Sequence, residues 1–420
     1  MTRTERQQEA VRKWLGNKGK GSIEASTGFG KTRVGLMTMQ ALLKKYPQLR
    51  VLVVVPTTTL KNQWQNEIDN WGFTFNTEIQ VINTVIKHSW TCDLLLLDEE
   101  HRYNSDDFSQ IFGKVKYKLI LGLTATFERL DGKHRIMQKY CPIVDSISIL
   151  ECQMNGWVSE YKEYLVLIDV DNIDAYKQLN KDWMQHFEFF QFDFGLAMSM
   201  VKPGVGWKNK LKYRDDLYQG SDEYKKKEIL GNINYHSAGF IRTMTARKAF
   251  INNHPKKVEI AQKIIEARSD KKIITFSNNV QMAEAIQNGE NVYTGRLSKK
   301  RSANMIEEFN AVETGVLNTC AKANEGLDVR GLSVAIILGT DSSETKARQR
   351  RGRTVRKEGD KIAEIFYIVI KNTAEEKWVK NNHKSDQNYI TIDEHGLEQV
   401  LNGEQPDLYK PKLGEIMFRF

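Results

Sequence analysis

The sequence contains little cysteine and no long apolar run. Its four cysteines are far apart: Cys92, Cys141, Cys152 and Cys320. This spacing argues against a disulfide framework and a zinc cluster, and for a reducing compartment. No apolar run approaches the roughly 18 residues of a membrane span, and the polar start MTRTERQQEA lacks the apolar core of a signal peptide. We therefore expect a cytoplasmic protein without a membrane partner.

The length and net charge of the chain indicate how many domains it can form and what kind of partner it could bind. With 420 residues the chain is long enough for two or three domains. It has 40% hydrophobic and 27% charged residues, as a soluble globular protein does. The net charge of +9 favours a polyanionic partner, although many basic proteins bind no nucleic acid.

Two stretches of the chain alternate short apolar runs with amphipathic helices. Apolar runs that end in polar residues are typical of strands buried on both faces of a parallel sheet. The predicted strands are 51–56, 93–100 and 119–126 in the first stretch, and 272–277, 333–339 and 364–370 in the second. The predicted helices are 31–46, 258–267 and 299–310. This order predicts an α/β fold with two parallel-sheet domains.

A change in composition sets the expected domain boundaries. Residues 171–250 are rich in aromatic and charged residues and lack strands that end in polar residues. The expected organisation is a first domain over 1–150, a linker and mostly helical insertion over 151–250, a second domain over 251–385 and a C-terminal tail over 386–420.

The sequence ASTGFGKT at 25–32 predicts a phosphate-binding loop. Gly28 and Gly30 let the backbone curl so that its N–H groups point at phosphate oxygens, with Thr27 and Phe29 completing the loop. In such a loop the lysine that opens the helix, Lys31, reaches the terminal phosphates, and the following Thr32 holds Mg²⁺. A glycine-rich turn that only caps a helix remains the alternative for this motif alone.

A second motif makes the ATP site specific. The apolar strand predicted at 93–100 ends in Asp98 and Glu99, which a phosphate-loop enzyme needs on the neighbouring strand. Asp98 is expected to bind Mg²⁺ through water, and Glu99 to orient and deprotonate the attacking water. Loop and acids together predict a site for ATP and Mg²⁺.

These motifs resemble those of superfamily 2 helicases of the DExH type. Ala25, in the first position of the loop, is usual in that superfamily, and DEEH at 98–101 resembles its second motif. The resemblance covers about 1–150 and 250–385 and implies two RecA-like domains with ATP between them. DEEH, the compact length and residues 150–170 are most similar to phage DNA helicases of the UvsW kind and to restriction-type and XPB-like relatives. A phage source, and so a host bacterial cytoplasm, is the matching expectation.

Further motifs of the family follow in order along the chain. VVPTTTLKNQW (54–64) resembles motif Ia, TAT (124–126) motif III and NEGLD (324–328) motif V. The resemblance implies DNA contacts from Pro56, Thr57, Thr58, Arg129 and Thr319, coupling of ATP hydrolysis to DNA through Thr124 and Thr126, and a place in the ATP site for Asp328. His101 is expected to join this coupling, with a purely structural hydrogen bond as the alternative.

The stretch QRRGRTVR (349–356) resembles motif VI. The resemblance implies that Arg353 and Arg356 act as arginine fingers on the γ-phosphate, with Gln349 in the same cleft. Arg350 and Arg351 are not fixed by the pattern. The alternative for this stretch alone is a solvated basic helix.

The N-terminal QQEAV (7–11) resembles the element by which the family recognises adenine. Gln7 is the preferred residue because Ala10 lies three residues on, and Gln8 is the alternative. The arginine that the family often has three residues before this glutamine is Thr4 here.

The insertion offers two further candidates. Lysines and arginines between 202 and 227 alternate with tyrosine and tryptophan, which suggests a segment that clamps DNA at a junction, or else a solvated basic surface. The aromatic cluster at 183–194 is expected to form helix core rather than a platform for stacked bases.

The sequence therefore predicts an ATP-dependent DNA helicase that remodels forked or branched DNA in replication, recombination or repair. The alternatives are a duplex translocase without strand separation, an RNA-stimulated ATPase of the same superfamily, and a nucleotide-dependent scaffold. Glu99 and the arginine pair argue against a scaffold, because a scaffold needs no hydrolytic groups. No metal-binding acidic cluster of a nuclease lies outside the ATP site. A monomer is the simplest expectation.

Overall fold

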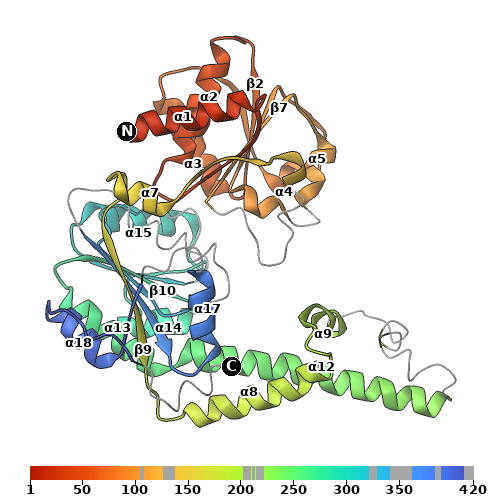
Figure 1. The fold of residues 1–420 in the computed structure, drawn as a ribbon, viewed down its shortest axis with the longest axis vertical. Coiled ribbons are helices and arrows are strands. Elements are labelled where there is room, and N and C mark those ends of the chain that lie inside the picture. Colours follow the sequence, from red (N-terminus) through yellow and green to blue (C-terminus); the bar gives the residue numbers. More distant parts are fainter. Residues whose placement is uncertain are drawn as a thin grey trace.

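The computed structural model describes residues 1–104, 108–125, 138–201, 210, 213, 222–320, 329–340, 362–383 and 389–410. They form two separate parallel sheets, one above the other in Figure 1, and a helical arm that extends from the second sheet. Each sheet carries helices on both faces. The predicted α/β class with two RecA-like domains and a helical insertion is confirmed. Among the described residues no helix combines the length and apolar character needed to cross a membrane.

The first sheet has six parallel strands in the order β3-β2-β5-β7-β1-β8. Their bounds are β1 Lys20–Ala25, β2 Arg50–Val55, β3 Asn76–Val81, β5 Leu94–Asp98, β7 Leu119–Thr124 and β8 Ile143–Ile147. A separate parallel ribbon joins β4 (Trp90–Thr91) to β6 (Val115–Lys116). The predicted strands at 51–56, 93–100 and 119–126 are confirmed as β2, β5 and β7.

The strands of this sheet are apolar on both faces because both faces are covered. On β2, Val53 and Val55 pack with helices α1 (Arg3–Gly16), α2 (Lys31–Leu43) and α3 (Thr58–Asn70). Leu52 and Val54 point to the other face and pack with α4 (Ile82–Val85) and α5 (Ile111–Lys114). Two 3-10 turns, Glu100–Asn104 and Phe108–Gln110, complete that face. The helix predicted at 31–46 is therefore confirmed as α2.

The second sheet has seven parallel strands in the order β11-β12-β10-β13-β14-β9-β15. Their bounds are β9 Tyr161–Ile168, β10 Lys272–Ser277, β11 Val292–Tyr293, β12 Gly315–Cys320, β13 Val334–Ile337, β14 Ala363–Ile370 and β15 Tyr389–Ile392. One face packs on α13 (Pro255–Ala267), α14 (Val280–Ile286) and α18 (Glu394–Leu401), and the other on α15 (Lys299–Ala311) and α17 (Ala374–Asn382). The predicted strands and helices of this half are confirmed.

Four strands of the second sheet were not predicted: β11 and β12 lie inside the expected second domain, and β9 and β15 lie outside it. β9 falls within the expected linker and insertion, yet it pairs with β14 over eight residues, from Tyr161–Ala363 to Ile168–Ile370. β15 falls within the expected C-terminal tail and pairs with β9. The chain therefore contributes one strand to the second sheet before it forms the insertion and another after β14.

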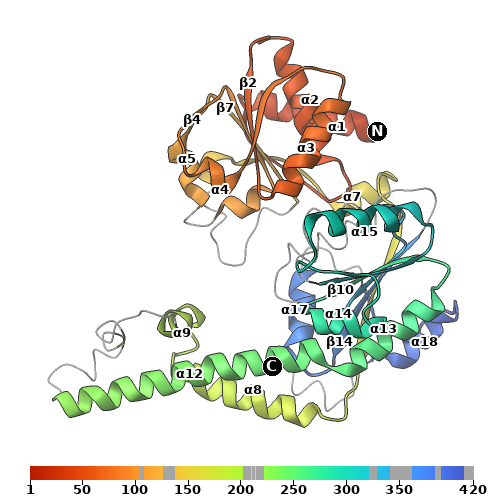
Figure 2. The same cartoon turned by 180° about the vertical axis from the view of Figure 1, so that it is seen from behind.

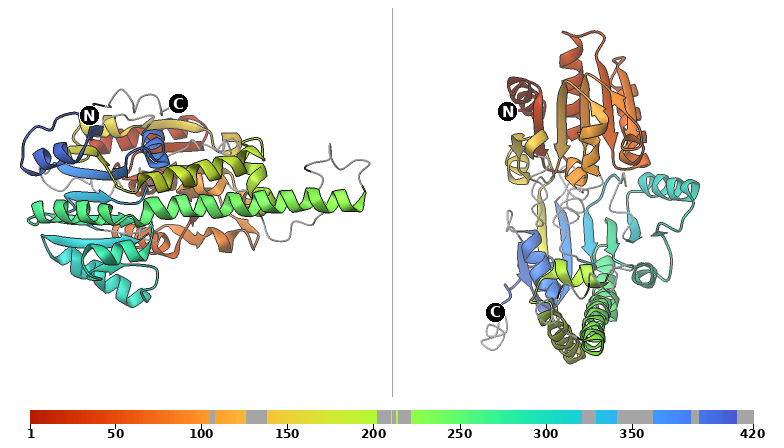
Figure 3. Two further views of the ribbon diagram at one scale, coloured as in Figure 1. Left: turned by 90° about the horizontal axis from the view of Figure 1, so that it is seen from below. Right: turned by 90° about the vertical axis from the view of Figure 1, so that its right-hand side faces the viewer.

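The insertion is a helical arm made of α8 (Ile173–Glu188), α9 (Phe194–Val201) and α12 (Glu223–Asn253). Helix α12 passes along the second sheet and continues well beyond it, as Figures 2 and 3 show. The aromatic cluster predicted as core is confirmed in its main part, because Phe187 and Phe190 pack against Phe240 with ring centroids 5.4 and 6.2 Å apart. Phe192 and Phe194 of the same cluster are exposed.

Candidate functional site

The glycine-rich loop joins the end of β1 to the start of α2. Gly28 and Gly30 both have φ of +94°, a region that favours glycine, so the predicted curled backbone is present. Gly30 caps α2 without any side-chain hydrogen bond, which leaves the first-turn amides of that helix facing the loop. Lys31 lies half-buried with Nζ 3.4 Å from the carbonyl oxygen of Ala25. Thr27 and Thr32 are also half-buried here.

Two side chains of α1 hold the loop from behind. Gln7 is buried and its amide nitrogen donates to the carbonyl oxygen of Phe29 at 2.7 Å. Arg3 donates to the same carbonyl at 2.8 Å and to the carbonyl of Gly28. Gln8 is exposed, so the structure favours Gln7 over it as the functional glutamine. The adenine contact of Gln7 stays a prediction, because the described contact fixes the loop.

Arg3 was missed in the sequence. The family's arginine was sought three residues before Gln7, where Thr4 stands, whereas Arg3 is four residues before it. Residues four apart lie on the same face of a helix, so both side chains of α1 reach the loop. This spacing was the available signal.

The acid pair lies at the end of β5. The indole nitrogen of Trp64 donates to Asp98 Oδ2 at 2.8 Å, and the amide of Glu99 donates to Asp98 Oδ1 at 3.0 Å. Burial and the Glu99 carboxylate raise the pKa of Asp98 to about 6, while Trp64 and Lys31 act in the opposite direction. A divalent cation held by Thr32, and through water by Asp98, would offset this repulsion, so the chemistry of the residues present fits the predicted Mg²⁺ site.

One expectation about this strand was wrong. The acids were placed on the strand next to the loop strand β1, but β7 lies between β5 and β1. β5 pairs with β2 and β7. The carboxyl ends of all these strands still share one edge of the sheet, which brings Asp98 close enough to Lys31 for their charges to interact.

Glu99 has an unusual backbone and a free carboxylate oxygen. Its φ is +50°, a left-handed conformation that is uncommon for residues other than glycine. Among the described residues, its buried Oε2 accepts no hydrogen bond, although Nδ1 of His101 lies 3.5 Å away. Oε2 therefore keeps an unused capacity to accept a hydrogen bond, which a general base needs to take a proton from water.

His101 connects the acid pair to the next strand. Its Nδ1 lies 3.1 Å from Oγ1 of Thr124, at the end of β7, and 3.5 Å from Glu99 Oε2. Both His101 and Thr124 are buried. Two of the three predicted coupling residues, His101 and Thr124, are thus in contact, and His101 also lies near Glu99.

The next residue, Glu100, points away from this site. It is fully buried, and burial raises its pKa to about 8, which favours the neutral carboxyl. A Cβ on Gly122 of β7 would lie 1.8 Å from Glu100 Oε2, so only glycine at 122 leaves room for this side chain.

The predicted DNA contacts are placed differently from one another. Pro56 and Thr57 are half-buried and Thr58 is exposed at the carboxyl end of β2. Thr57 caps α3, because its hydroxyl accepts from the amide of Leu60 at 3.3 Å. Thr319 is a correction: it is fully buried in β12 and its hydroxyl donates to the carbonyl of Thr275 at 2.6 Å, so we no longer assign it to the DNA surface.

Several predicted site residues lie outside the described residues. They are Thr126, Arg129, Asp328, Gln349, Arg350, Arg351, Arg353 and Arg356. Most of the basic segment at 202–227 lies outside them too. Their roles stay predictions.

Comparison with known proteins shows to which family the chain belongs. A family model described as the Type III restriction enzyme res subunit matches residues 1–89 and 74–129, and one described as the helicase conserved C-terminal domain matches 256–358. The chain belongs to the superfamily 2 helicases. It is therefore an ATP-dependent helicase or translocase, and this family uses ATP with a divalent metal.

Similar proteins occur in archaea and in viruses. A "DNA 3'-5' translocase XPB2" of Sulfurisphaera tokodaii is 27% identical over 393 residues, which are 88% of this chain and 82% of that protein. A "putative ATP-dependent RNA helicase" of Methanocaldococcus jannaschii is 23% identical, over 85% of this chain and 56% of its own length. The helicase domain of Pyrococcus furiosus Hef has the same fold, with a TM-score of 0.51 over 89% of this chain and 96% of that domain at 18% identity.

Proposed function

We propose that this superfamily 2 helicase is a DNA motor that remodels forked or branched DNA in replication, recombination or repair. The observation that supports it most is the hydrolytic set around Glu99: a left-handed backbone, a carboxylate oxygen without a hydrogen bond among the described residues, and contact through His101 with the end of β7. The likeness to an archaeal DNA translocase over most of the chain supports DNA as the substrate.

In this proposal each residue of the ATP site has one task. Lys31 and the first-turn amides of α2 bind the phosphates, and Thr32 and Asp98 hold Mg²⁺, which supplies charge stabilisation at the γ-phosphate. Glu99 takes the proton from the attacking water. Arg353 and Arg356 of the second domain stabilise the developing charge, so the two domains close only while the triphosphate is intact.

The DNA surface is proposed from exposed residues at the carboxyl edge of the first sheet. Thr58 and its neighbours at the start of α3, together with Arg129, would contact the phosphate backbone. The segment at 202–227 would clamp the junction beside the helical arm. Motif style supports a phage source of the UvsW kind, and a monomeric motor in a bacterial host cytoplasm is the accompanying proposal.

The test is ATP hydrolysis by the wild type and by Lys31→Ala, alone and with single-stranded DNA, duplex, fork, four-way junction or RNA. Lys44→Ala serves as the matched control, because Lys44 is exposed at the other end of the same helix. We expect forks and junctions to stimulate the wild type and the control strongly, and the mutant not at all. Stimulation by RNA alone would favour the RNA-stimulated ATPase, and stimulation by duplex without strand displacement would favour a translocase.

A further inference from the structure

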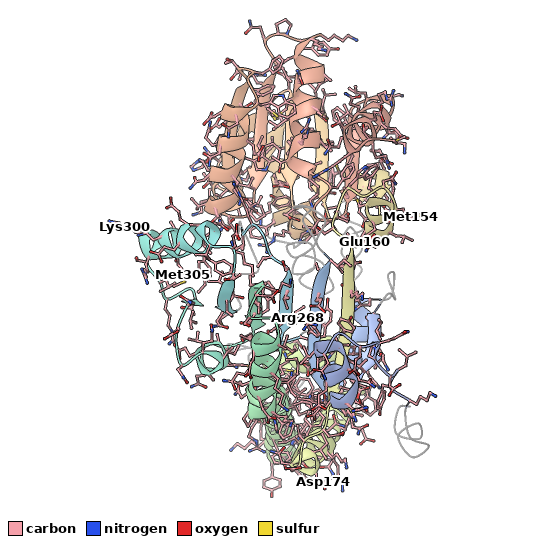
Figure 4. The ribbon with its side chains drawn as sticks, turned by 90° about the vertical axis from the view of Figure 1, so that its left-hand side faces the viewer. Met154, Glu160, Asp174, Arg268, Lys300 and Met305 are labelled. Carbon is pink, nitrogen blue, oxygen red and sulfur yellow. The ribbon has the colours of Figure 1, made fainter. Side chains whose placement is uncertain are left out.

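The short stretch between the two sheets packs directly against the phosphate loop. It consists of α7 (Ile149–Met154) and residues 155–160, which lead into β9. Figure 4 shows Met154, the last residue of α7, and Glu160, the last residue before β9, at the boundary between the domains. No motif considered in the sequence assigned it a role. Three of its side chains nevertheless touch the loop.

The three contacts run along the whole loop. Cys152 Sγ lies 3.2 Å from Ser26 Oγ, and the ring of Trp157 lies 5.8 Å from the ring of Phe29. A Cβ on Gly28 would lie only 3.0 Å from Val158, so that side chain rests against the loop backbone. Cys152, Trp157 and Val158 are all buried. The loop cannot shift at Phe29 without pushing on Trp157 and Val158, because close-packed side chains leave no free space.

A specific turn places Trp157 in this position. Gly156 has φ of +64° and its amide donates to the carbonyl of Gln153, while the amide of Trp157 donates to the carbonyl of Cys152, both at 2.8 Å. These two bonds form the Schellman motif that ends a helix, with glycine at the left-handed position. The turn directs the Trp157 ring back onto Phe29 instead of into solvent.

The other end of the stretch is fixed to the second sheet. The carbonyl of Glu160 accepts from the amide of Ala363 at 2.8 Å, and Tyr161 pairs with Ala363 in register. β9 lies between β14 and β15 inside that sheet. β14 begins at Ala363, directly after the segment that carries Arg353 and Arg356. Only two residues, Ser159 and Glu160, separate the loop contact at Val158 from the strand.

We propose that Trp157 is a positioning residue that links the phosphate loop to the second domain. When the loop binds phosphate, Phe29 and Gly28 move against Trp157 and Val158, and the displacement passes through β9 to the start of β14. The linker thus helps to orient the second domain for closure over the nucleotide. This effect adds to any direct contact of the arginines with the nucleotide. This inference rests on the proposed ATP site and deepens its regulation.

The test compares Trp157→Ala and Trp157→Phe with the wild type. The readout is the ratio of DNA affinities measured with a non-hydrolysable ATP analogue and without nucleotide, on forked DNA. Coupling between two sites amounts to a factor of about 5–150. We expect Trp157→Ala to reduce this ratio at least about fivefold while the analogue still binds, and Trp157→Phe, which keeps an aromatic ring, to retain most of it.

Control variants separate coupling from folding. Trp90→Ala removes a partly buried tryptophan of the same domain whose indole bonds to the carbonyl of Val85, far from the loop contacts, and should leave the ratio unchanged. If Trp157→Ala does not fold, Gly156→Ala replaces it. This variant opposes the left-handed turn but keeps the Trp157 ring, and it should lower the affinity ratio in the same way. An unchanged affinity ratio in folded Trp157→Ala or Gly156→Ala would overturn this inference but leave the proposed motor function intact. A wild type whose DNA affinity ignores nucleotide would overturn both this inference and the proposed motor.

Discussion

The buried ion pair of the second domain gives a quantitative prediction. Nζ of Lys257, on α13, donates to both carboxylate oxygens of Glu375, on α17, at 2.7 Å each and to the carbonyl of Leu338 at 2.8 Å. Both side chains are fully buried. Burial lowers the pKa of Lys257 and raises that of Glu375, so desolvation opposes the attraction between them. The pair joins helices on opposite faces of the second sheet through the end of β13.

Removing one partner is expected to destabilise this domain strongly. At 2.7 Å two unit charges attract by ~6 kcal/mol for an effective dielectric constant of about 20, and desolvation offsets part of that. Lys257→Met keeps the apolar stem but leaves Glu375 buried without its cation, which costs about 3–5 kcal/mol. For a domain of this size the melting temperature should fall by about 10 °C or more. The double variant Lys257→Met/Glu375→Leu should recover at least half of the loss, because it leaves no unpaired charge.

Calorimetry of the full chain, supported by urea unfolding, measures these differences. Lys263→Met is the matched control, since Lys263 lies on the same helix but forms an exposed pair with Glu259 at 3.4 Å. Its effect should stay below about 1 kcal/mol. The reasoning fails if Lys257→Met falls within the range of this control, or if the double variant is no more stable than the single one.

Three further predictions follow from the first domain and the arm. Arg3→Ala should lower kcat/KM for ATP about tenfold, because the loop loses hydrogen bonds from a charged donor. Arg12 is exposed on the same helix, so Arg12→Ala should match the wild type. Equal steady-state kinetics of Arg3→Ala and the wild type would contradict this prediction. Gly122→Ala should cost about 3 kcal/mol or more in thermal unfolding, because of the Glu100 carboxyl, whereas Gly113→Ala meets open space and should not. His186 and His236 touch each other in the arm at 3.3 Å, and burial lowers the pKa of each below 6.5. As the pH falls, the histidines of the unfolded arm take up protons at a higher pH than those of the folded arm, so the stability of the folded arm should decrease below pH 6.5. Near-ultraviolet circular dichroism should show this decrease in the wild type and a smaller decrease in His236→Phe. Identical pH profiles would exclude the histidine pair as the cause.

Much of the fold was predictable because parallel sheets covered on both faces require continuous apolar strands. Such runs are short and end in polar residues, so β2, β5, β7, β10, β13 and β14 were all located correctly. Strand order was not predictable in the same way: nothing local to Asp98 indicates that β7 separates β5 from β1. β1, β3, β8, β11 and β12 were not located, and β9 and β15 were not assigned to the second sheet, because their place in it depends on pairing that no local pattern encodes.

The candidate site likewise contains residues that the sequence identified and residues that it did not. Glycines, a lysine and acids at fixed spacing identified the loop and the acid pair, because each is required by the chemistry of phosphate binding. The supporting residues were not identified: Trp64 and Trp157 act through contacts between segments distant in sequence, and the only signal for Arg3 was its spacing from Gln7. Thr319 was assigned by its place in a motif, and its burial depends on the neighbouring strand β10.

The place of β9 has a consequence for how this chain folds during synthesis. β9 pairs with β14 and β15, and 194 residues of chain lie between Ile168 and Ala363. At about 5–20 residues per second, a ribosome needs roughly 10–40 s to deliver the first partner of β9. During that interval the first domain can already be complete, while the apolar strand that follows it has an unpaired edge on both sides. The newly made chain therefore has a period in which β9 needs protection from aggregation, which its own fold supplies only at the end.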